Sequence, residues 1–331
     1  MNYKLRTKIM LDLLIIGGSA AGSAAAIYAA RRKLNFKIVA VDLGGEVALS
    51  GEVNNWLGEQ SIQGFELAKK FNDHVKSYGV EIDQGFAVEK IEQKNNYHII
   101  TAKNMAGEVK TYEAISVIVA TGIHPRKLNI PGEKEFDRKG VTYCTVCDGP
   151  LFKEKITATI GAGNSALESA IMMAGIAKKH YLITKYPDTK EANGGFPKGE
   201  NILIDKVKKN KNVEIIYEAN TTEILGEGVV KSLKYKVMKE PSSAKATADE
   251  EEIEVQGIMV HAGLIPNSDF IDCVEKDRAG QIMIDAKCTT NVPGIFAAGD
   301  VTNVPYKQIA VAAGQGVIAA LSAIEYINKH A

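Results

Sequence analysis

The sequence is poor in several features that would place it in a specialised class of protein. It has 4 cysteines and 1 tryptophan among 331 residues, and 40 Lys and Arg are balanced by 40 Asp and Glu. So few cysteines exclude a disulfide-stabilised scaffold, and zero net charge provides no basic field for nucleic acid. No run approaches the ~20 apolar residues of a membrane span, and Asp12 interrupts the apolar run near the N-terminus. We therefore expect a cytoplasmic protein without nucleic-acid or membrane partners.

What the sequence does contain is a phosphate-binding pattern near its start. Residues 11–42 read as a short apolar strand, a glycine turn, an Ala-rich helix and a second strand that ends at Asp42. Such a βαβ unit places a pyrophosphate at the helix N-terminus and a ribose hydroxyl on the acid. Ser19 stands where the second glycine of the pattern is usual. The residues of the predicted turn are Gly17, Gly18, Ser19, Ala20, Ala21 and Gly22.

The same pattern recurs at residues 156–185, where Gly161, Gly163 and Ala166 form a G-x-G-x-x-A turn. The second strand here ends in Thr184 and Lys185 without an acid, and Lys198 follows in the next loop. A missing acid with nearby cations favours a nucleotide that carries a 2′-phosphate; alternatively, these lysines only keep a loop in water. Two dinucleotide-binding units in one chain predict a flavoprotein that receives hydride from a nicotinamide.

Two further strand ends are candidates for the first nucleotide site. One ends at Thr121 and Gly122, the other at Gly299 and Asp300. Ligands of open parallel sheets lie beyond the carboxyl ends of the strands, so Asp300 is predicted to accept a hydrogen bond from a sugar-like hydroxyl. The alternative is that Asp300 caps the next helix. The alanine-rich run 308–327 predicts a C-terminal helix whose N-terminus points its dipole at an electron-rich ring; the alternative is an ordinary core helix.

The cysteines at positions 144 and 147 form a C-x-x-C pair followed directly by Asp148. A structural zinc site needs four ligands, and no second C-x-x-C or suitably spaced histidine supplies them, so we predict no metal site. A redox dithiol needs one thiolate to attack a disulfide and a second to resolve the mixed disulfide. An adjacent carboxylic acid can carry the proton of that exchange.

The order of the motifs resembles the low-molecular-weight thioredoxin reductase family from end to end. The motifs are GGSAAG, GGE, EVNNWLG, ATGIHPRKLNIPGE, YCTVCDG, GAGNSALESA, GLIPN, GIFAAGDV and KQIAVAAGQG. The resemblance implies an α/β fold of two Rossmann-like three-layer dinucleotide-binding domains, the second inserted into the first. The FAD domain would comprise residues 1–127 and 257–331. Residues 128–256 would form the NAD(P)H-binding domain with the dithiol.

The resemblance also assigns roles. Cys147 would lie against the flavin and form the charge-transfer thiolate, Cys144 would attack the thioredoxin disulfide, and Asp148 would be the acid-base residue. A homodimer and hinges near residues 127 and 256 are also implied. The expected FAD contacts are Gly17, Gly18, Ser19, Ala20, Ala21, Gly22, Asp42, Gly45, Glu46, Asn55, Thr121, Gly122, Gly299, Asp300, Gln308 and Ile309. Those expected at the nicotinamide nucleotide are Gly161, Gly163, Asn164, Ser165, Lys185 and Lys198.

One departure from the family concerns the electron donor. NADPH-dependent members follow the second strand of the small domain with a His-Arg-Arg run, whereas this chain has Thr184, Lys185 and Tyr186. A Lys offers the 2′-phosphate a point charge but no bidentate contact. We predict a thioredoxin-disulfide reductase that uses NADPH, with NADH or a ferredoxin-like donor as alternatives. A dithiol oxidase or a reductase of a peroxiredoxin system is the alternative activity.

Overall fold

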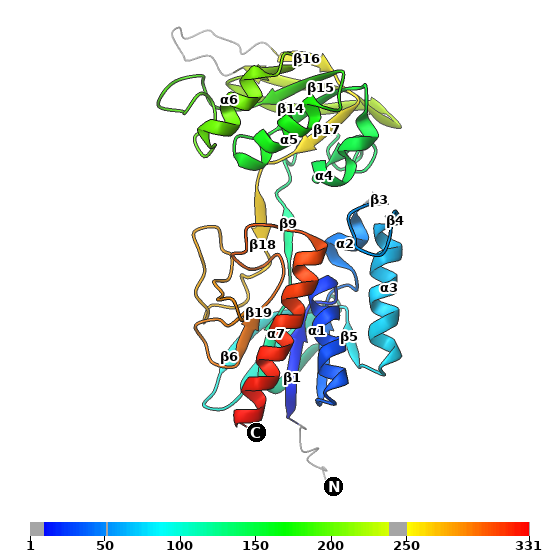
Figure 1. The fold of residues 1–331 in the computed structure, drawn as a ribbon, viewed down its shortest axis with the longest axis vertical. Coiled ribbons are helices and arrows are strands. Elements are labelled where there is room, and N and C mark those ends of the chain that lie inside the picture. The colour runs from blue at the N-terminus through cyan, green and yellow to red at the C-terminus, as the bar shows by residue number, and fades with distance from the viewer. Residues whose placement is uncertain (1–9, 51, 238–249, 331) are drawn as a thin grey trace. The chain divides into compact units, whose positions relative to one another are not determined.

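The computed structural model describes residues 10–50, 52–237 and 250–330. The chain divides into two compact units (Figure 1): unit 1 is Met1–His124 with Ile265–Ala331, and unit 2 is Pro125–Leu264. The boundaries expected from the sequence, after residues 127 and 256, differ from this division by three and eight residues. The stretch PSSAKATAD at residues 241–249, whose polar composition predicts a loop, lies outside the described residues.

Unit 1 is built on a sheet whose parallel strands follow the order β5-β2-β1-β8-β19. The first half of β8 also pairs antiparallel with β7, which pairs with β6. The strands are β1 (Leu11–Ile16), β2 (Phe36–Ala40), β5 (Ile82–Gln84), β6 (Phe86–Gln93), β7 (His98–Asn104), β8 (Val109–Val119) and β19 (Ile295–Ala297), with a small pair β3 (Glu52–Val53) and β4 (Ile62–Gln63). This parallel order is that of a doubly wound nucleotide-binding sheet.

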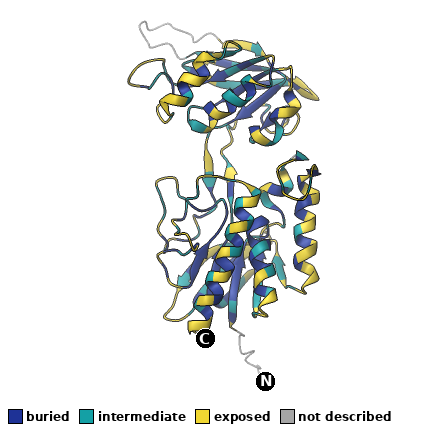
Figure 2. Ribbon diagram, viewed as in Figure 1, coloured by how far each residue is buried: buried dark blue, intermediate teal, exposed yellow. Residues whose placement is uncertain are grey.

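The helices of unit 1 are α1 (Ala20–Arg31), α2 (Gly45–Leu49), α3 (Gly64–Ser77) and α7 (Ile309–His330). Strand β1 shows how the sheet separates two cores, because successive side chains point to opposite faces. Leu13 and Ile15 pack with the alanines of α1 and α7, whereas Leu14 and Ile16 pack with β6, β7 and the segment 271–292. Figure 2 shows the strands buried and the outer faces of the helices exposed.

Helix α7 is long and apolar enough to cross a membrane by length and composition, with a mean hydropathy of 1.5. The expectation that no run reaches this measure was therefore wrong. Its packing accounts for the composition: Ala319, Ala320 and Ala323 are fully buried, and a Cβ at Gly316 would lie 2.1 Å from the carbonyl oxygen of Ala21 on α1. Small residues on α7 therefore allow the close approach of α1.

Unit 2 repeats the architecture with a parallel sheet of order β10-β17-β11-β12-β13. Helices cover one face and a three-stranded antiparallel sheet, β14-β15-β16, covers the other. The elements are β10 (Val141–Thr142), α4 (Thr145–Asp148), the 3₁₀ helix η1 (Gly149–Phe152), β11 (Ile156–Ile160), α5 (Asn164–Ala174), β12 (Lys179–Ile183), α6 (Asn201–Lys209), β13 (Val213–Ile216), β14 (Ala219–Glu227), β15 (Val229–Val237), β16 (Glu250–Glu254) and β17 (Gly257–Val260). The predicted α/β class with two dinucleotide-binding folds is confirmed.

The chain passes between the units along two paired strands, β9 (Ile123–Pro125) and β18 (Leu264–Pro266). The backbone N–H of Arg126 donates to the carbonyl of Gly263 at 2.9 Å and extends this pairing into unit 2. The return to unit 1 comes later than expected because β17 first pairs with β10 and β11 in the sheet of unit 2.

Candidate active site

The first glycine turn joins β1 to α1, and its glycines are required by close packing. Gly17 has a φ of +114°, and a Cβ there would lie 2.2 Å from the carbonyl oxygen of Ala120. A Cβ on Gly22 would lie 1.9 Å from the carbonyl oxygen of Gly17. No side chain fits at either position, so the N-terminus of α1 can approach the sheet edge closely. Ala20 and Ala21 then begin the helix.

The side chain of Ser19, which stands in the place of the second glycine of the pattern, has a defined hydrogen-bond partner. Its hydroxyl donates to the carbonyl of Gly44 at 2.5 Å. In the same loop the backbone N–H of Gly45 donates to Oδ1 of Asp42 at 2.6 Å. Ser19 therefore supports the loop that holds the acid at the end of β2, and Glu46 follows in the first turn of α2.

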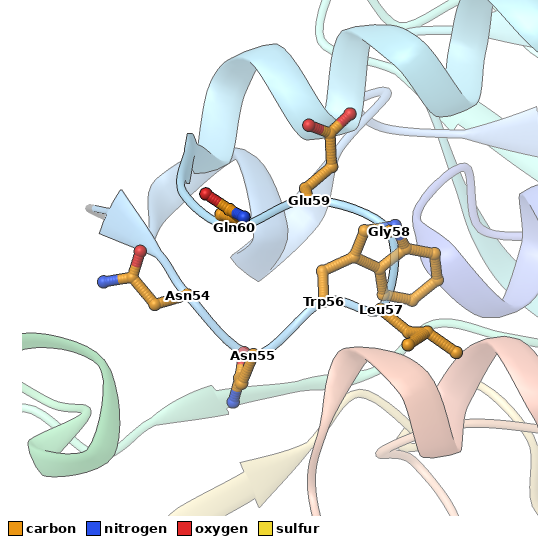
Figure 3. Close-up of a pocket in the computed structure, with 7 residues that line it drawn as sticks. All are labelled: Asn54, Asn55, Trp56, Leu57, Gly58, Glu59 and Gln60. Atoms are coloured by element: carbon orange, nitrogen blue, oxygen red, sulfur yellow. The ribbon is translucent and has the colours of Figure 1, made fainter.

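A third part of the predicted FAD site joins two residues that lie far apart in the sequence. Nδ2 of Asn55 donates to Oε1 of Gln308 at 3.1 Å. Asn55 belongs to the loop between β3 and β4, which lines a cavity of about 560 Å³ (Figure 3). Trp56 in this loop packs edge-on against Phe71 of α3, with ring centroids 5.2 Å apart. Gln308 directly precedes Ile309, the first residue of α7.

The strand end at Thr121 and Gly122 is held by Asn267, a residue that sequence reasoning did not single out. The Thr121 hydroxyl donates to the Asn267 carbonyl at 2.6 Å, and Nδ2 of Asn267 donates to the Thr121 carbonyl at 2.8 Å. Gly122 has a φ of +69°, and a Cβ there would meet no protein atom within 4 Å. The strand end is therefore fixed, and the space beside it is open.

Asp300 follows β19 at the second strand end. Burial raises the pKa of its carboxyl to about 6; Lys307 lowers the pKa and Glu46 raises it further. Helix α7 begins at Ile309, so the alternative that Asp300 caps the next helix is wrong. Gly299, whose N–H donates to Gln315 at 2.8 Å, precedes it with a φ of +79°. A partly buried carboxylate at this edge fits a hydroxyl-rich ligand such as the ribose of FAD.

The second glycine turn joins β11 to α5. A Cβ on Gly161 would lie 2.5 Å from the carbonyl oxygen of His261, whereas one on Gly163 would meet no atom within 4 Å. The turn is thus closely packed at Gly161 and open at Gly163, next to the N-terminus of α5, where a dinucleotide phosphate fits. Lys198 bridges to Gly163 through the backbone, so this predicted cation lies beside the turn.

Other groups around the second turn have protein partners. Nδ2 of Asn164 donates to Oε1 of Glu200 at 2.8 Å, and its Oδ1 accepts from the Glu200 N–H at 2.9 Å. Ser165 lies in the first turn of α5 and is exposed. Lys185 is exposed at the end of β12, with its Nζ 5.3 Å from the centre of the Tyr186 ring. The turn therefore has a carboxylate as well as lysines beside it.

The C-x-x-C pair lies in unit 2, at the start of α4. Cys144 and Cys147 are joined in a disulfide with their Cα atoms 5.3 Å apart. Thr142 links the pair to Asp148: its Oγ1 accepts from the Cys144 N–H at 3.1 Å and donates to the Asp148 carboxylate. Burial raises the pKa of Asp148, while the Thr142 hydrogen bond and Arg138 oppose the shift. A carboxyl with a raised pKa next to a disulfide holds a proton more readily than an ordinary aspartate and is suited to proton exchange with a thiol.

A second set of polar contacts involves Thr145, the first residue of the helix α4 that follows Cys144. The hydroxyl of Thr145, between the two cysteines, lies 2.8 Å from Nε2 of His261 and 2.7 Å from Oγ of Ser169. Thr142, Thr145, Ser169 and His261 were missed from the sequence because no motif contains them all. Among the described residues no group of three or more His, Cys, Asp or Glu side chains is placed to hold a metal ion.

A family model described as pyridine nucleotide-disulphide oxidoreductase matches residues 11–316. The chain belongs to this family. Members bind FAD and a nicotinamide dinucleotide, and the redox disulfide that the sequence predicted agrees with this membership. The space beside Gly122 and Gly163 and the carboxylate of Asp300 are compatible with the dinucleotides that the family binds.

Relatives within the pyridine nucleotide-disulphide oxidoreductases carry more than one name. The alkyl hydroperoxide reductase subunit of Escherichia coli (strain K12) is 40% identical over 329 residues, which cover 98% of this chain and 60% of that protein. A protein named NADH dehydrogenase from Ferdinandcohnia aciditolerans is 36% identical over 328 residues, covering 99% and 59%. The chain thus spans about 60% of the length of these curated relatives.

This chain spans nearly the whole length of solved thioredoxin reductase structures. The enzyme from Streptococcus pyogenes MGAS5005 superimposes with a TM-score of 0.83 at 31% identity, covering 98% of this chain and 100% of that one. The enzyme from T. acidophilum is 38% identical, with a TM-score of 0.64 and coverage of 97% and 99%. The predicted resemblance to thioredoxin reductases is confirmed.

Proposed function

We propose that this chain is an FAD-dependent reductase that transfers electrons from NADPH, through Cys144 and Cys147, to the disulfide of a thioredoxin-like protein. The observation that carries the proposal is the Cys144–Cys147 disulfide, which lies in the same unit as a dinucleotide turn and directly before a carboxyl with a raised pKa. The fully covered thioredoxin reductase structures support the choice of substrate class.

The chain's own residues account for the exchange with the substrate disulfide. In the reduced enzyme the Cys144 thiolate attacks one substrate sulfur, which forms a mixed disulfide and releases the second sulfur as a thiolate. The Asp148 carboxyl supplies the proton for that thiolate. The Cys147 thiolate then attacks Sγ of Cys144, which re-forms the Cys144–Cys147 disulfide and releases the second substrate thiolate. Two electrons leave the dithiol for each substrate reduced.

The reduced dithiol must be regenerated from the nucleotide side. FAD, when bound, supplies a ring that takes an electron pair from a nicotinamide and passes it to the disulfide. In unit 1 Asp300, Asn55 and Gln308 would hold FAD. In unit 2 the turn from Gly161 to Ser165 would hold the nicotinamide nucleotide, with Lys185 and Lys198 facing a 2′-phosphate. Unit 1 is proposed as the FAD domain, which the sequence placed at residues 1–127 and 257–331, and unit 2 as the nicotinamide domain, which the sequence placed at residues 128–256.

A second candidate function is favoured by the sequence relatives. Two alkyl hydroperoxide reductase subunits, those of Escherichia coli and Pseudomonas putida, are 40% and 39% identical to this chain. We infer that the same dithiol could serve a peroxide-reducing system, with the thioredoxin-like disulfide on another protein or module. The relative named NADH dehydrogenase makes NADH a second candidate donor.

The test is stopped-flow mixing of the oxidised, flavin-loaded protein with NADPH and separately with NADH. Flavin absorbance at 450 nm should bleach within seconds with NADPH, and thioredoxin disulfide should then be reduced. Cys147→Ser should lower thioredoxin turnover at least ~1,000-fold, because the resolving thiolate is lost. Cys273→Ser is the matched control, since Cys273 is a free cysteine outside the pair. Absence of bleaching with both nucleotides would refute the nicotinamide donor.

A further inference from the structure

A continuous chain of hydroxyl groups and imidazoles runs through unit 2 and ends under the dithiol helix. From β11 and β12, Thr157 Oγ1 lies 2.8 Å from Nδ1 of His180, whose Nε2 lies 3.1 Å from Thr159 Oγ1. Thr159 continues to Ser169 Oγ on α5 at 2.7 Å. Ser169 reaches Thr145 Oγ1 at 2.7 Å, and Thr145 meets His261 Nε2 at 2.8 Å. The proposed disulfide chemistry does not use this chain of groups.

The members of this network are paired in a largely dry environment. Thr145, Thr157, Thr159, Ser169 and His180 are each less than 5% exposed. Burial lowers the pKa of His180 to about 3 and that of His261 to about 4. Both imidazoles are therefore neutral, and each has one donor and one acceptor nitrogen. Loss of one hydroxyl would leave a polar atom of each neighbour without its partner, which is costly in a buried site.

One member of the network, Thr145, belongs to the short helix that carries Cys147. Thr145 is the first residue of α4 and lies between Cys144 and Cys147 in the sequence. A helix of four residues has almost no stability of its own, so its contacts decide how the cysteines are held. The hydroxyl of Thr145 attaches the buried side of α4 to Ser169 and His261. Val146 on the same helix is 55% exposed.

His261 provides a rigid support for this attachment. Its backbone N–H donates to the Ile160 carbonyl at 2.8 Å, which continues the pairing of β17 with β11. Its carbonyl oxygen occupies the space where a Cβ of Gly161 would lie. The backbone of His261 is therefore held by the central sheet and by the nucleotide turn, so its imidazole is a fixed point of attachment for Thr145.

We propose that Thr145 and His261 are positioning residues that hold α4 in the arrangement required by the Cys144–Cys147 disulfide, and so shift the dithiol–disulfide equilibrium toward the disulfide. Reduction breaks the covalent S–S bond, and the two sulfurs must separate to van der Waals distance. Thr145 is covalently bonded to Cys144 and shares α4 with Cys147, so movement of the cysteines apart strains its two hydrogen bonds in the reduced form. The inference rests on the proposed function only in that the pair is redox-active.

The experiment measures the dithiol equilibrium directly in the full-length, flavin-loaded protein. Protein is equilibrated anaerobically in mixtures of reduced and oxidised dithiothreitol, quenched in acid and alkylated. The tryptic peptide from Gly140 to Lys153 carries both cysteines of the pair and neither of the others, so its mass reports the reduced fraction. Thr145→Val and His261→Phe should each shift the equilibrium about 3- to 10-fold toward the dithiol, or ~15–30 mV.

Two further variants separate positioning from general stability. Thr145→Ser keeps the hydroxyl and should restore the wild-type equilibrium. Thr157→Val removes a hydroxyl at the far end of the same network, where its partner is His180; it should lower the unfolding midpoint and leave the equilibrium within 1.5-fold of wild type. Unchanged equilibria in both Thr145→Val and His261→Phe, or an equal shift in Thr157→Val, would overturn the proposal.

The readout is independent of the proposed electron donor and acceptor. If neither nicotinamide bleaches the flavin, the proposed function fails, but the equilibrium with dithiothreitol still reports on Thr145 and His261. If the flavin bleaches and thioredoxin is reduced while the equilibria are unchanged, the positioning role alone is wrong.

Discussion

The two glycine turns of this protein share a backbone pattern but differ in what surrounds them. At the first, Gly17 and Gly22 are packed so tightly that no side chain fits, and carboxylates at Asp42 and Asp300 lie at the sheet edge. At the second, Gly161 is packed against His261 but Gly163 is open, and Lys198 lies alongside. The backbone of each turn thus forms the phosphate site, and the side chains around the turn determine which sugar or phosphate groups fit beside it.

A Cβ at the closest-packed position should break the first turn. Gly22→Ala would place a methyl group 1.9 Å from the Gly17 carbonyl oxygen and push α1 away from β1. We expect a loss of about 3 kcal/mol or more in unfolding free energy and at least ~10-fold less bound flavin. Denaturant unfolding and the ratio of absorbance at 450 and 280 nm measure both. Wild-type flavin content together with wild-type stability would contradict this account of the turn.

Asp300→Asn tests whether burial of the Asp300 carboxylate in unit 1 makes the stability of the protein depend on pH. The pKa of Asp300 in the folded protein is about 6, above its ordinary value of 3.8. Burying the charged form therefore costs stability above pH 6, and this cost disappears as pH falls toward 4. In flavin-free protein we expect Asp300→Asn to be more stable than wild type by about 2 to 3 kcal/mol at pH 8.

The same pair of proteins should be equally stable at pH 4, where wild-type Asp300 is largely protonated. In the presence of FAD the order should reverse, because the amide is a weaker acceptor for a ribose hydroxyl than the carboxylate. A stability difference that does not change between pH 4 and pH 8 would show that burial of the charge is not its cause.

The cations at the second turn should separate the two nicotinamide donors. In the double variant Lys185→Ala and Lys198→Ala we expect the KM for NADPH to rise about 5- to 10-fold, because two charged contacts to the 2′-phosphate are lost. The KM for NADH should not change. Steady-state turnover with each nucleotide measures the difference, and Lys190→Ala, an exposed lysine of the same loop, is the control. Equal effects on both nucleotides would refute a phosphate contact.

Gly163→Ala should have the smallest effect on folding. Its Cβ would point into open space at a φ of −115°, so the unfolding free energy should change by less than about 0.5 kcal/mol. Nicotinamide affinity should fall by several-fold, because the methyl group enters the space proposed for the phosphate. Titration monitored by quenching of flavin fluorescence measures this. Affinity equal to that of wild type would place the phosphate elsewhere.

Both βαβ units could be predicted from the sequence because strand, turn and helix are encoded within about thirty residues of each other. The proximity of Asn55 and Gln308, which are 253 positions apart, could be expected only through the family resemblance. The Thr145–His261 contact spans 116 positions, and a lone histidine after a strand carries no signal. The later return of the chain to unit 1 was missed for a similar reason: β17 is defined by its pairing with distant strands.

The paired strands β9 and β18 have a consequence for how such a protein can be assembled. The chain leaves unit 1 along β9 and re-enters it along β18. Because these strands are paired, the two points at which unit 1 is interrupted lie side by side. An insertion at such a place closes only a short gap in its host and costs little chain entropy. Unit 2 could therefore be replaced by a short hairpin, or by a different redox domain, without a change in the path of the chain through unit 1.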